Sequence, residues 1–121
     1  MTQIHRQPSS TRGLVAYQVA LDLVRAVTPL LPRIARVDAN LADQAKRAVT
    51  GVPLHVAEAM RRTGRDRAHL LTVALGSTGE TAAALETAVA RGALEPEAIA
   101  EALALADSEC GLLFGLRRKG G

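Results

Sequence analysis

The stretch LLTVALGSTGETAAALETAVA, residues 70–90, decides the fold class. Apolar or small residues recur in it at alternating intervals of four and three, as Leu71, Leu75, Thr78, Ala82, Leu85 and Val89. This spacing places all six on one face of an α-helix. Thr63-Gly64 and Arg91-Gly92 flank the stretch, and glycine readily adopts the left-handed conformation that ends helices. The pattern predicts a helix from about residue 65 to residue 91.

Three further helices follow from the same spacing on either side of this stretch. The first is expected from Gly13, with a row of Leu14, Tyr17, Leu21, Val24, Thr28 and Leu31, and Pro29 and Pro32 should end or bend it between about residues 28 and 36. The second is capped by Asp38 or Asn40, is expected to be continuous but bent at Pro53, and buries Leu41, Ala45, Ala48, Val49, Val52, Val56 and Met60. The last is opened by Glu95-Pro96-Glu97 and buries Ile99, Leu103, Ala106, Cys110 and Leu113.

The composition fits helices that pack closely. Hydrophobic residues make up 48% of the 121 positions, but aromatic residues make up only 2%, and Ala and Leu dominate the rest. We therefore expect an all-α, antiparallel up-down-up-down four-helix bundle over residues 13–118, with a flexible arm at 1–12 and a frayed end at 119–121. Cys110 is the single cysteine, and we find neither a secretory leader nor an uncharged membrane-length run, so a cytoplasmic protein without membrane contact is expected.

Charge is distributed unevenly along the chain. Residues 1–69 hold eleven Lys or Arg against five acids, whereas residues 70–110 hold Arg91 alone against seven acids. One part of the molecule should be electropositive and another electronegative. This asymmetry suits an anionic partner, and it equally suits contact between copies of the same chain.

The densest basic cluster surrounds the turn between the second and third helices. It comprises Arg61, Arg62, Arg65 and Arg67, with Lys46 and Arg47 grouped with it. Guanidinium groups pair with phosphate oxygens, so the cluster is a candidate nucleic-acid-binding surface. The alternative is a solvated turn whose arginines pair with Glu58, Asp66 or the acids of a neighbouring subunit.

A second basic segment, Arg117, Arg118 and Lys119, closes the last helix. We expect it at the opposite end of the bundle from the arginine turn, either as a separate nucleic-acid contact or as a solubilising tail. With so few aromatic residues to stack on bases, binding should be driven by the phosphate backbone and show little sequence preference.

Other candidate sites are weaker. His55 and Glu58 share a helix face but lack the further ligands of a metal site, so neither a metal nor another cofactor is expected. The run Gly76–Thr81 lacks the strand and the Gly-Lys-Ser/Thr ending of a phosphate-binding loop, so its small residues, like Gly111 and Gly115, should instead allow close helix packing. Cys110 has no basic neighbour to activate it. No catalytic residue is predicted.

The order of several motifs resembles a known family. Gln44-x-x-Arg47-Ala48-Val49, Val52-Pro53-x-x-Val56-Ala57-Glu58-Ala59 and Ala74-x-Gly76-Ser77-x-x-Glu80 are similar to the four-helix-bundle proteins encoded within intervening sequences of bacterial 23S rRNA genes. These are related to the accessory variability proteins of diversity-generating retroelements. His55 and Ala59 stand where that family usually has Asn and Gly.

The resemblance implies a non-catalytic homopentamer, and for the retroelement branch a basic surface that binds nucleic acid and a reverse transcriptase. Together with the charge pattern, it leads us to expect a scaffold or accessory protein that binds RNA or DNA. The alternative is a protein-interaction adaptor, for example for a reverse transcriptase or another basic enzyme, that does not bind nucleic acid.

Overall fold

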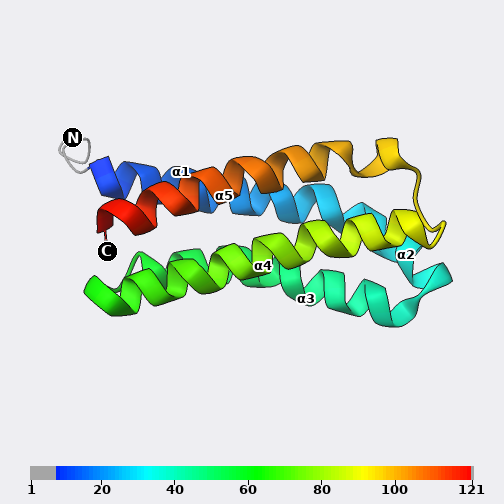
Figure 1. Cartoon of the computed structure of the whole chain (residues 1–121), viewed down its shortest axis with the longest axis horizontal. Helices are drawn as coiled ribbons and strands as arrows, with labels where there is room; N and C mark the ends of the chain where they lie inside the picture. Colours follow the sequence, from blue (N-terminus) through cyan, green and yellow to red (C-terminus); the bar gives the residue numbers. More distant parts are fainter. Residues whose placement is uncertain (1–7, 121) are drawn as a thin grey trace.

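A computed structural model describes residues 8–120, which form four antiparallel helical rods (Figure 1). The first rod runs through three successive segments, α1, the short 3-10 helix η2, and α2. The others are α3, α4 and α5, with the 3-10 helix η3 leading into α5. Their bounds are α1 Pro8–Val27, η2 Thr28–Leu30, α2 Leu31–Val37, α3 Ala39–Ala59, α4 Gly64–Ala90, η3 Pro96–Ile99 and α5 Ala100–Gly120. No strand occurs in this range, so the predicted all-α bundle is confirmed.

The rods alternate in direction, and each packs on two neighbours. α1 lies against α3 and α5, and α4 lies against the same two helices from the other side. Figure 1 shows the start of α1, the turn from α3 to α4 and the end of α5 at one end of the bundle. The α2–α3 and α4–α5 connections lie at the other end.

Local chemistry explains where the helices begin and end. The Asp38 carboxylate accepts a hydrogen bond from the Leu41 amide at 2.9 Å and caps α3. Gly64 and Gly92 have φ angles of 60° and 82°, which glycine adopts without steric cost, at the turns that precede and follow the body of α4. α3 continues through Pro53, as predicted.

Two ion pairs connect elements at the end opposite the α3–α4 turn. The Arg91 Nε atom lies 3.1 Å from the Asp38 carboxylate, and Arg33 Nη2 donates to both Glu95 carboxylate oxygens at 2.9 and 3.0 Å. The Arg33 hydrogen bonds hold the pKa of Glu95 below its usual value. Both pairs remain partly exposed to solvent, so each adds at most about 1 kcal/mol to stability.

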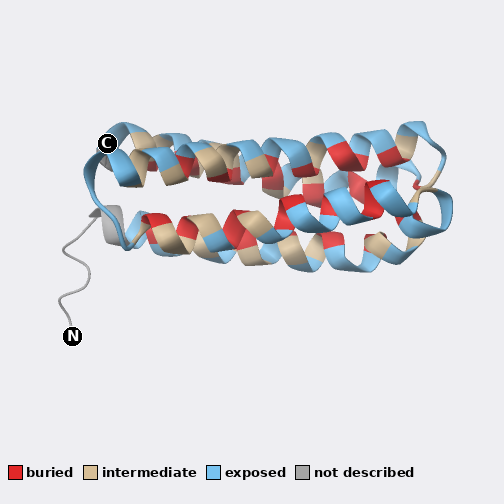
Figure 2. Ribbon diagram, turned by 90° about the horizontal axis from the view of Figure 1, so that it is seen from below, coloured by how far each residue is buried: buried red, intermediate tan, exposed pale blue. Residues whose placement is uncertain are grey.

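The core is built from small and medium aliphatic side chains on the inner faces of the rods (Figure 2). On the first rod the buried row is Ala16, Ala20, Leu23, Val27, Leu30 and Ile34. The row predicted from the sequence was wrong by one helix position, since Leu14 is 57% exposed and Thr28 is exposed. Both rows have the same spacing, and the structure buries the row whose first members are alanines, because they allow neighbouring backbones to approach.

The ends of the bundle domain differ from the predicted ones. α1 begins at Pro8, so residues 8–12 of the predicted arm are helical, while residues 1–7 lie outside the described part of the chain. α5 continues to Gly120 rather than fraying at Lys119, and Gly121 is also outside the described residues.

The segment Thr11–Val37 is long and apolar enough to cross a membrane, judged by length and composition alone. A core helix of a bundle meets the same criterion, and this segment contributes Ala20, Leu23 and Val27 to the buried cluster. The finding is therefore weak evidence for a membrane span.

Four helical glycines do not have the packing role expected of them within the bundle. A Cβ atom added to Gly76, Gly79, Gly111 or Gly115 would meet nothing within 4 Å. Glycine inside a helix costs about 1 kcal/mol relative to alanine, so packing of the single chain does not account for these residues.

A buried carboxyl group interrupts the core on α5. Glu109 is fully buried and neither of its carboxylate oxygens has a hydrogen-bond partner among the described residues. The prediction that Cys110 is the buried residue of this turn was wrong, since Cys110 is only partly buried. The buried row of the fourth rod starts with Ile99 at the end of η3 and continues in α5 as Ala102, Ala106, Glu109, Leu113 and Leu116.

Glu109 belongs to a polar layer that divides the core. The hydrogen bond between Arg117 and Thr72 sets the register of α5 against the antiparallel helix α4. Equal distances from this bond along the two helices place Glu109 at the level of Thr78 and Thr81. Both threonines are fully buried and donate to carbonyls of their own helix, at 2.8 Å each. One hydrophobic cluster, with Leu85 and Ala106, lies on one side of this layer, and another, with Leu71 and Leu113, lies on the other.

Burial raises the pKa of Glu109 to about 8, with no charged group contributing to the shift. The folded chain therefore holds a proton on Glu109 at pH values where the unfolded chain has lost it. Since the folded state binds more protons between the ordinary glutamate pKa and about pH 8, stability must fall as pH rises through that window.

We predict that the free energy of unfolding decreases from pH 5 to pH 8, by up to about 1.4 kcal/mol for each pH unit. Glu109→Gln removes this slope, because the amide does not titrate. Urea unfolding measured at several pH values tests this, with Glu101→Gln as a control, since Glu101 is exposed on the same helix. Parallel profiles for the wild type and Glu109→Gln would contradict the assignment.

Candidate functional site

The two basic segments that were expected at opposite ends lie at the same end of the bundle. That expectation was wrong, because in an up-down-up-down bundle the fourth rod ends where the second rod ends. Figure 1 shows the end of α5 beside the turn between α3 and α4. The Arg117 Nη1 atom also donates to Thr72 Oγ1 at 3.3 Å, which ties α5 to the early turns of α4.

We call this end of the bundle the basic end. The α3–α4 turn and the end of α5 bring seven basic residues to it, against the two acids Glu58 and Asp66 of the same segments, and they are Arg61, Arg62, Arg65, Arg67, Arg117, Arg118 and Lys119. The N-terminus of the 27-residue helix α4 also points here and adds positive potential from its backbone dipole. The charge concentration therefore exceeds that of either segment alone.

Internal pairing differs among these side chains. Arg62 forms ion pairs with Glu58 and, at 4.0 Å, with Asp66. Arg61 and Arg65 are exposed and form no hydrogen bond or ion pair with any described residue. The solvated-turn interpretation therefore fits Arg62, whereas Arg61 and Arg65 remain available to an anion.

The α5 side of the basic end presents a different arrangement. Arg117 stands 5.3 Å above the Phe114 ring, and Phe114 is half exposed. Arg118 and Lys119 are exposed beyond it. The Phe114 ring and the Arg117 guanidinium thus form a stacked pair at the surface.

Arg67 is partly buried and lines a hollow between α1 and α3. The hollow has a volume of about 360 Å³ and is lined by Gly13, Leu14, Tyr17, Ala57, Met60 and Arg67. The Nε and Nη2 atoms of Arg67 have no hydrogen-bond partner among the described residues. An unpaired guanidinium at an apolar wall is unfavourable, because it loses water without gaining an acceptor.

Lys46 and Arg47 do not join the basic end. Lys46 precedes Arg61 by 15 residues, which corresponds to about 22 Å along a helix. Arg47 is held by hydrogen bonds to Asp43, one turn earlier on α3. Grouping these two residues with the arginine turn was wrong, because residues on the same helix that are about 15 positions apart are separated by about four helical turns.

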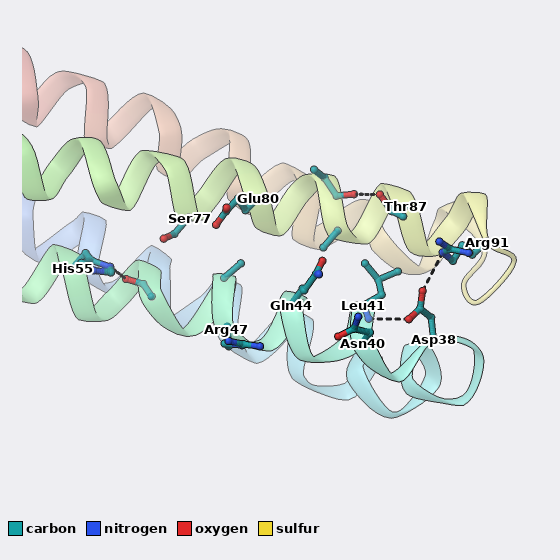
Figure 3. A pocket seen from close by; sticks show the side chains of 14 residues that line it. Asp38, Asn40, Leu41, Gln44, Arg47, His55, Ser77, Glu80, Thr87 and Arg91 are labelled. Atoms are coloured by element: carbon teal, nitrogen blue, oxygen red, sulfur yellow. Dashed lines mark hydrogen bonds and ion pairs between the residues drawn. The ribbon is translucent and has the colours of Figure 1, made fainter.

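Arg47 instead lines a groove between α3 and α4, drawn in Figure 3. The groove has a volume of about 670 Å³ and runs from the Asp38–Arg91 ion pair toward His55. Its α3 wall carries Asn40, Gln44, Arg47 and His55, and its other wall carries Ser77, Glu80 and Thr87 on α4 and Arg91 directly after α4. Leu41, three alanines and Gly51 complete the lining.

Small residues set the separation of the two helices along this groove. A Cβ atom added to Gly51 would lie 3.1 Å from Ser77 Oγ, so α3 and α4 approach closely there. The ring of His55 is bonded through Nδ1 to the Gly51 carbonyl at 2.7 Å. His55 is therefore oriented by its own helix and shows its remaining edge to the groove.

The groove and the hollow were both missed from the sequence. The residues Gln44, Arg47, Ser77 and Glu80 had been singled out by the resemblance, and all four line the groove. The groove could have been located from the polar residues that recur at helical spacing on both α3 and α4. The hollow depends on which face of α1 is buried, and the spacing did not resolve that.

Among residues 8–120, no group of three or more His, Cys, Asp or Glu side chains is arranged to hold a metal ion. Burial, followed by the carboxylates of Asp107 and Glu109, raises the pKa of the Cys110 thiol.

Comparison with known proteins identifies the fold and the family. The structure is similar to the crystal structure of a protein of unknown function from the S23 ribosomal protein family of Bacteroides thetaiotaomicron, with a TM-score of 0.80 and 18% sequence identity over 88% of this chain and 98% of the other. No curated protein matches the chain. The family model for 23S rRNA-intervening sequence proteins matches residues 12–115. This chain belongs to the family of 23S rRNA-intervening sequence proteins.

Proposed function

We propose that the protein is a non-catalytic, oligomeric accessory protein that binds the phosphate backbone of RNA or DNA through the basic end. The observation that carries this proposal is the convergence of the arginine turn and the α5 terminus at one end of the bundle, where Arg61 and Arg65 pair with none of the described residues. No cofactor takes part, and the setting is cytoplasmic without a membrane.

The charge arrangement favours backbone contacts over base reading. Each phosphate neutralised by a Lys or Arg side chain releases condensed counterions, so affinity depends steeply on salt. The basic residues sit on two different rods, which allows them to contact phosphates spaced along a strand or across a groove. Arginine is suited to this role because its planar guanidinium pairs with two phosphate oxygens at once.

We predict that the protein shifts structured RNA or duplex DNA at about 50 mM salt, where phosphate contacts are strongest. Arg61→Glu/Arg65→Glu should weaken binding at least about tenfold, because two contacts are replaced by repulsion. Fluorescence anisotropy with a labelled hairpin measures both.

The matched control is Arg25→Glu/Arg36→Glu, which makes the same change in net charge at exposed positions away from the basic end. Its affinity should stay within about threefold of the wild type, because charges farther than about 14 Å from the contact are largely screened at about 50 mM salt. Absence of binding at low salt, or an equal loss in both double variants, would refute the proposal.

The protein is further proposed to assemble as a homopentamer, as the family resemblance implies. Two features support an interface that the single chain leaves open. The α3–α4 groove has a floor of small residues, and Gly76 and Gly79 on α4 have open space where a side chain would stand. A neighbouring copy packed closely against α4 would account for helical glycines that cost stability in the monomer.

Light scattering should give a particle near five times the mass of the chain. Gly79→Leu should lower that mass without loss of helix content, since a Cβ atom added at Gly79 meets nothing within 4 Å in the monomer, whereas a leucine side chain there would obstruct a neighbour. Ala90→Leu, at an exposed position at the end of the same helix, serves as the control. A monomeric wild type contradicts the assembly.

A second candidate function is a protein-interaction adaptor, in which the same groove receives a segment of another protein. The convergence of Gln44, Arg47, Ser77 and Glu80 in the groove favours this possibility. A relation to the accessory variability proteins would make a reverse transcriptase the partner. Purification of the complex from the native host, followed by nuclease treatment, distinguishes an adaptor from a nucleic-acid-bridged association.

A further inference from the structure

The hollow beside Arg67 combines features that no packing role explains. Its walls are mainly apolar, yet one of them is Arg67, whose Nε and Nη2 atoms are buried and have no hydrogen-bond partner among residues 8–120. Leu14, on its rim, is 57% exposed. A site of this kind is completed by a group that has an apolar face and acceptor atoms on its edge.

Tyr17 gives the hollow an aromatic wall at the basic end. It is the only tyrosine of the chain, one of its two aromatic residues, and it is partly buried against the cluster that contains Leu71 and Leu113. Aromatic rings and guanidinium planes are the two kinds of surface on which unpaired bases stack. Tyr17 and Arg67 supply one of each to the same hollow.

The positive charges near the hollow favour a ligand that carries a negatively charged group next to the part that enters the hollow. Arg61 follows Met60 directly and Arg65 lies two residues before Arg67, and both are exposed and pair with no residue that the structure describes. A phosphate held by these arginines would place its own sugar and base within reach of the hollow. A neutral apolar peptide in the hollow would form no ion pair with Arg61 or Arg65.

The wall formed by Met60 can move to admit such a group. A Cβ atom added to Gly13 would overlap the Met60 sulfur, so this side chain packs directly on the backbone of α1. Methionine has three rotatable bonds and adapts to irregular partners. Movement of Met60 and Arg67 would open the hollow without displacing a helix.

We propose that the hollow receives one unpaired nucleobase, which stacks on Tyr17 and accepts hydrogen bonds from the Arg67 guanidinium, while Arg61 and Arg65 hold the adjacent phosphates. This inference rests on the nucleic-acid-binding function proposed above and adds that the substrate is single-stranded at the contact. A base within a duplex is stacked on its neighbours and does not enter a hollow of this kind.

Binding of a labelled single-stranded RNA is compared with that of a blunt duplex of equal length at about 50 mM salt. The wild type should prefer the single strand, and Tyr17→Leu should reduce single-strand affinity about tenfold, in keeping with the loss of one stacked base, while duplex affinity changes less than twofold. Tyr17→Phe keeps the ring and should retain the preference. Leu54→Ala, at an exposed position of α3 outside the hollow, is the control and should bind as the wild type.

Crosslinking tests the inference with the wild-type protein, so the result does not depend on whether a variant folds. A single strand containing 4-thiouridine, irradiated with the wild-type protein, should crosslink to Tyr17 or Met60, as identified by mass spectrometry. Crosslinks confined to residues outside the hollow overturn the inference. Equal affinity for duplex and single strand overturns it too but leaves the phosphate-binding function standing, whereas absence of all binding overturns both.

Discussion

Close antiparallel packing of small aliphatic side chains is the constraint on which the rest of this structure depends. Ala16 and Ala20 on α1, and Ala102 and Ala106 on α5, present little volume, so the backbones approach and the rods remain nearly straight. Because the rods alternate in direction, the start of the first rod, the turn between the second and third rods and the end of the fourth rod lie at the same end of the bundle. The position of the basic residues is a consequence of this geometry, and no dedicated interaction between the two basic segments is needed.

The same packing explains why an ionised carboxylate at Glu109 would destabilise the fold. Since no described residue bonds to its carboxyl oxygens, this buried group can avoid the cost of a buried charge only by staying protonated. The layer that it forms with Thr78 and Thr81 separates two hydrophobic clusters, one toward each end. The cluster nearer the basic end is the smaller of the two, and it contains the residues that support the hollow.

Much of the fold was predictable because capping residues and apolar spacing agree locally. Asp38, Gly64 and Gly92 set boundaries that the structure reproduces. The face of α1 was not predictable, because apolar residues occupy adjacent rows and only the fit to α3 and α5 selects Ala16 over Leu14. Glu109 was overlooked for a related reason, since a charged residue within an apolar row is ordinarily placed at the surface.

The candidate site was predictable only in part. The arginine turn is visible in the sequence, but its junction with Arg117 and Arg118 depends on the direction of the fourth rod, and Lys46 shows that sequence proximity does not imply spatial proximity on a helix. The hollow at Arg67 and the α3–α4 groove arise between helices and have no signature in any single segment.

The most direct test of the central claim, that one end of the bundle binds nucleic acid through two separate segments, is hydrogen–deuterium exchange of the full chain with and without RNA. The account predicts that peptides spanning residues 60–69 and 113–119 become protected together, while peptides from the α2–α3 and α4–α5 connections do not change. Protection confined to one of the two segments, or located at the opposite end, would contradict it.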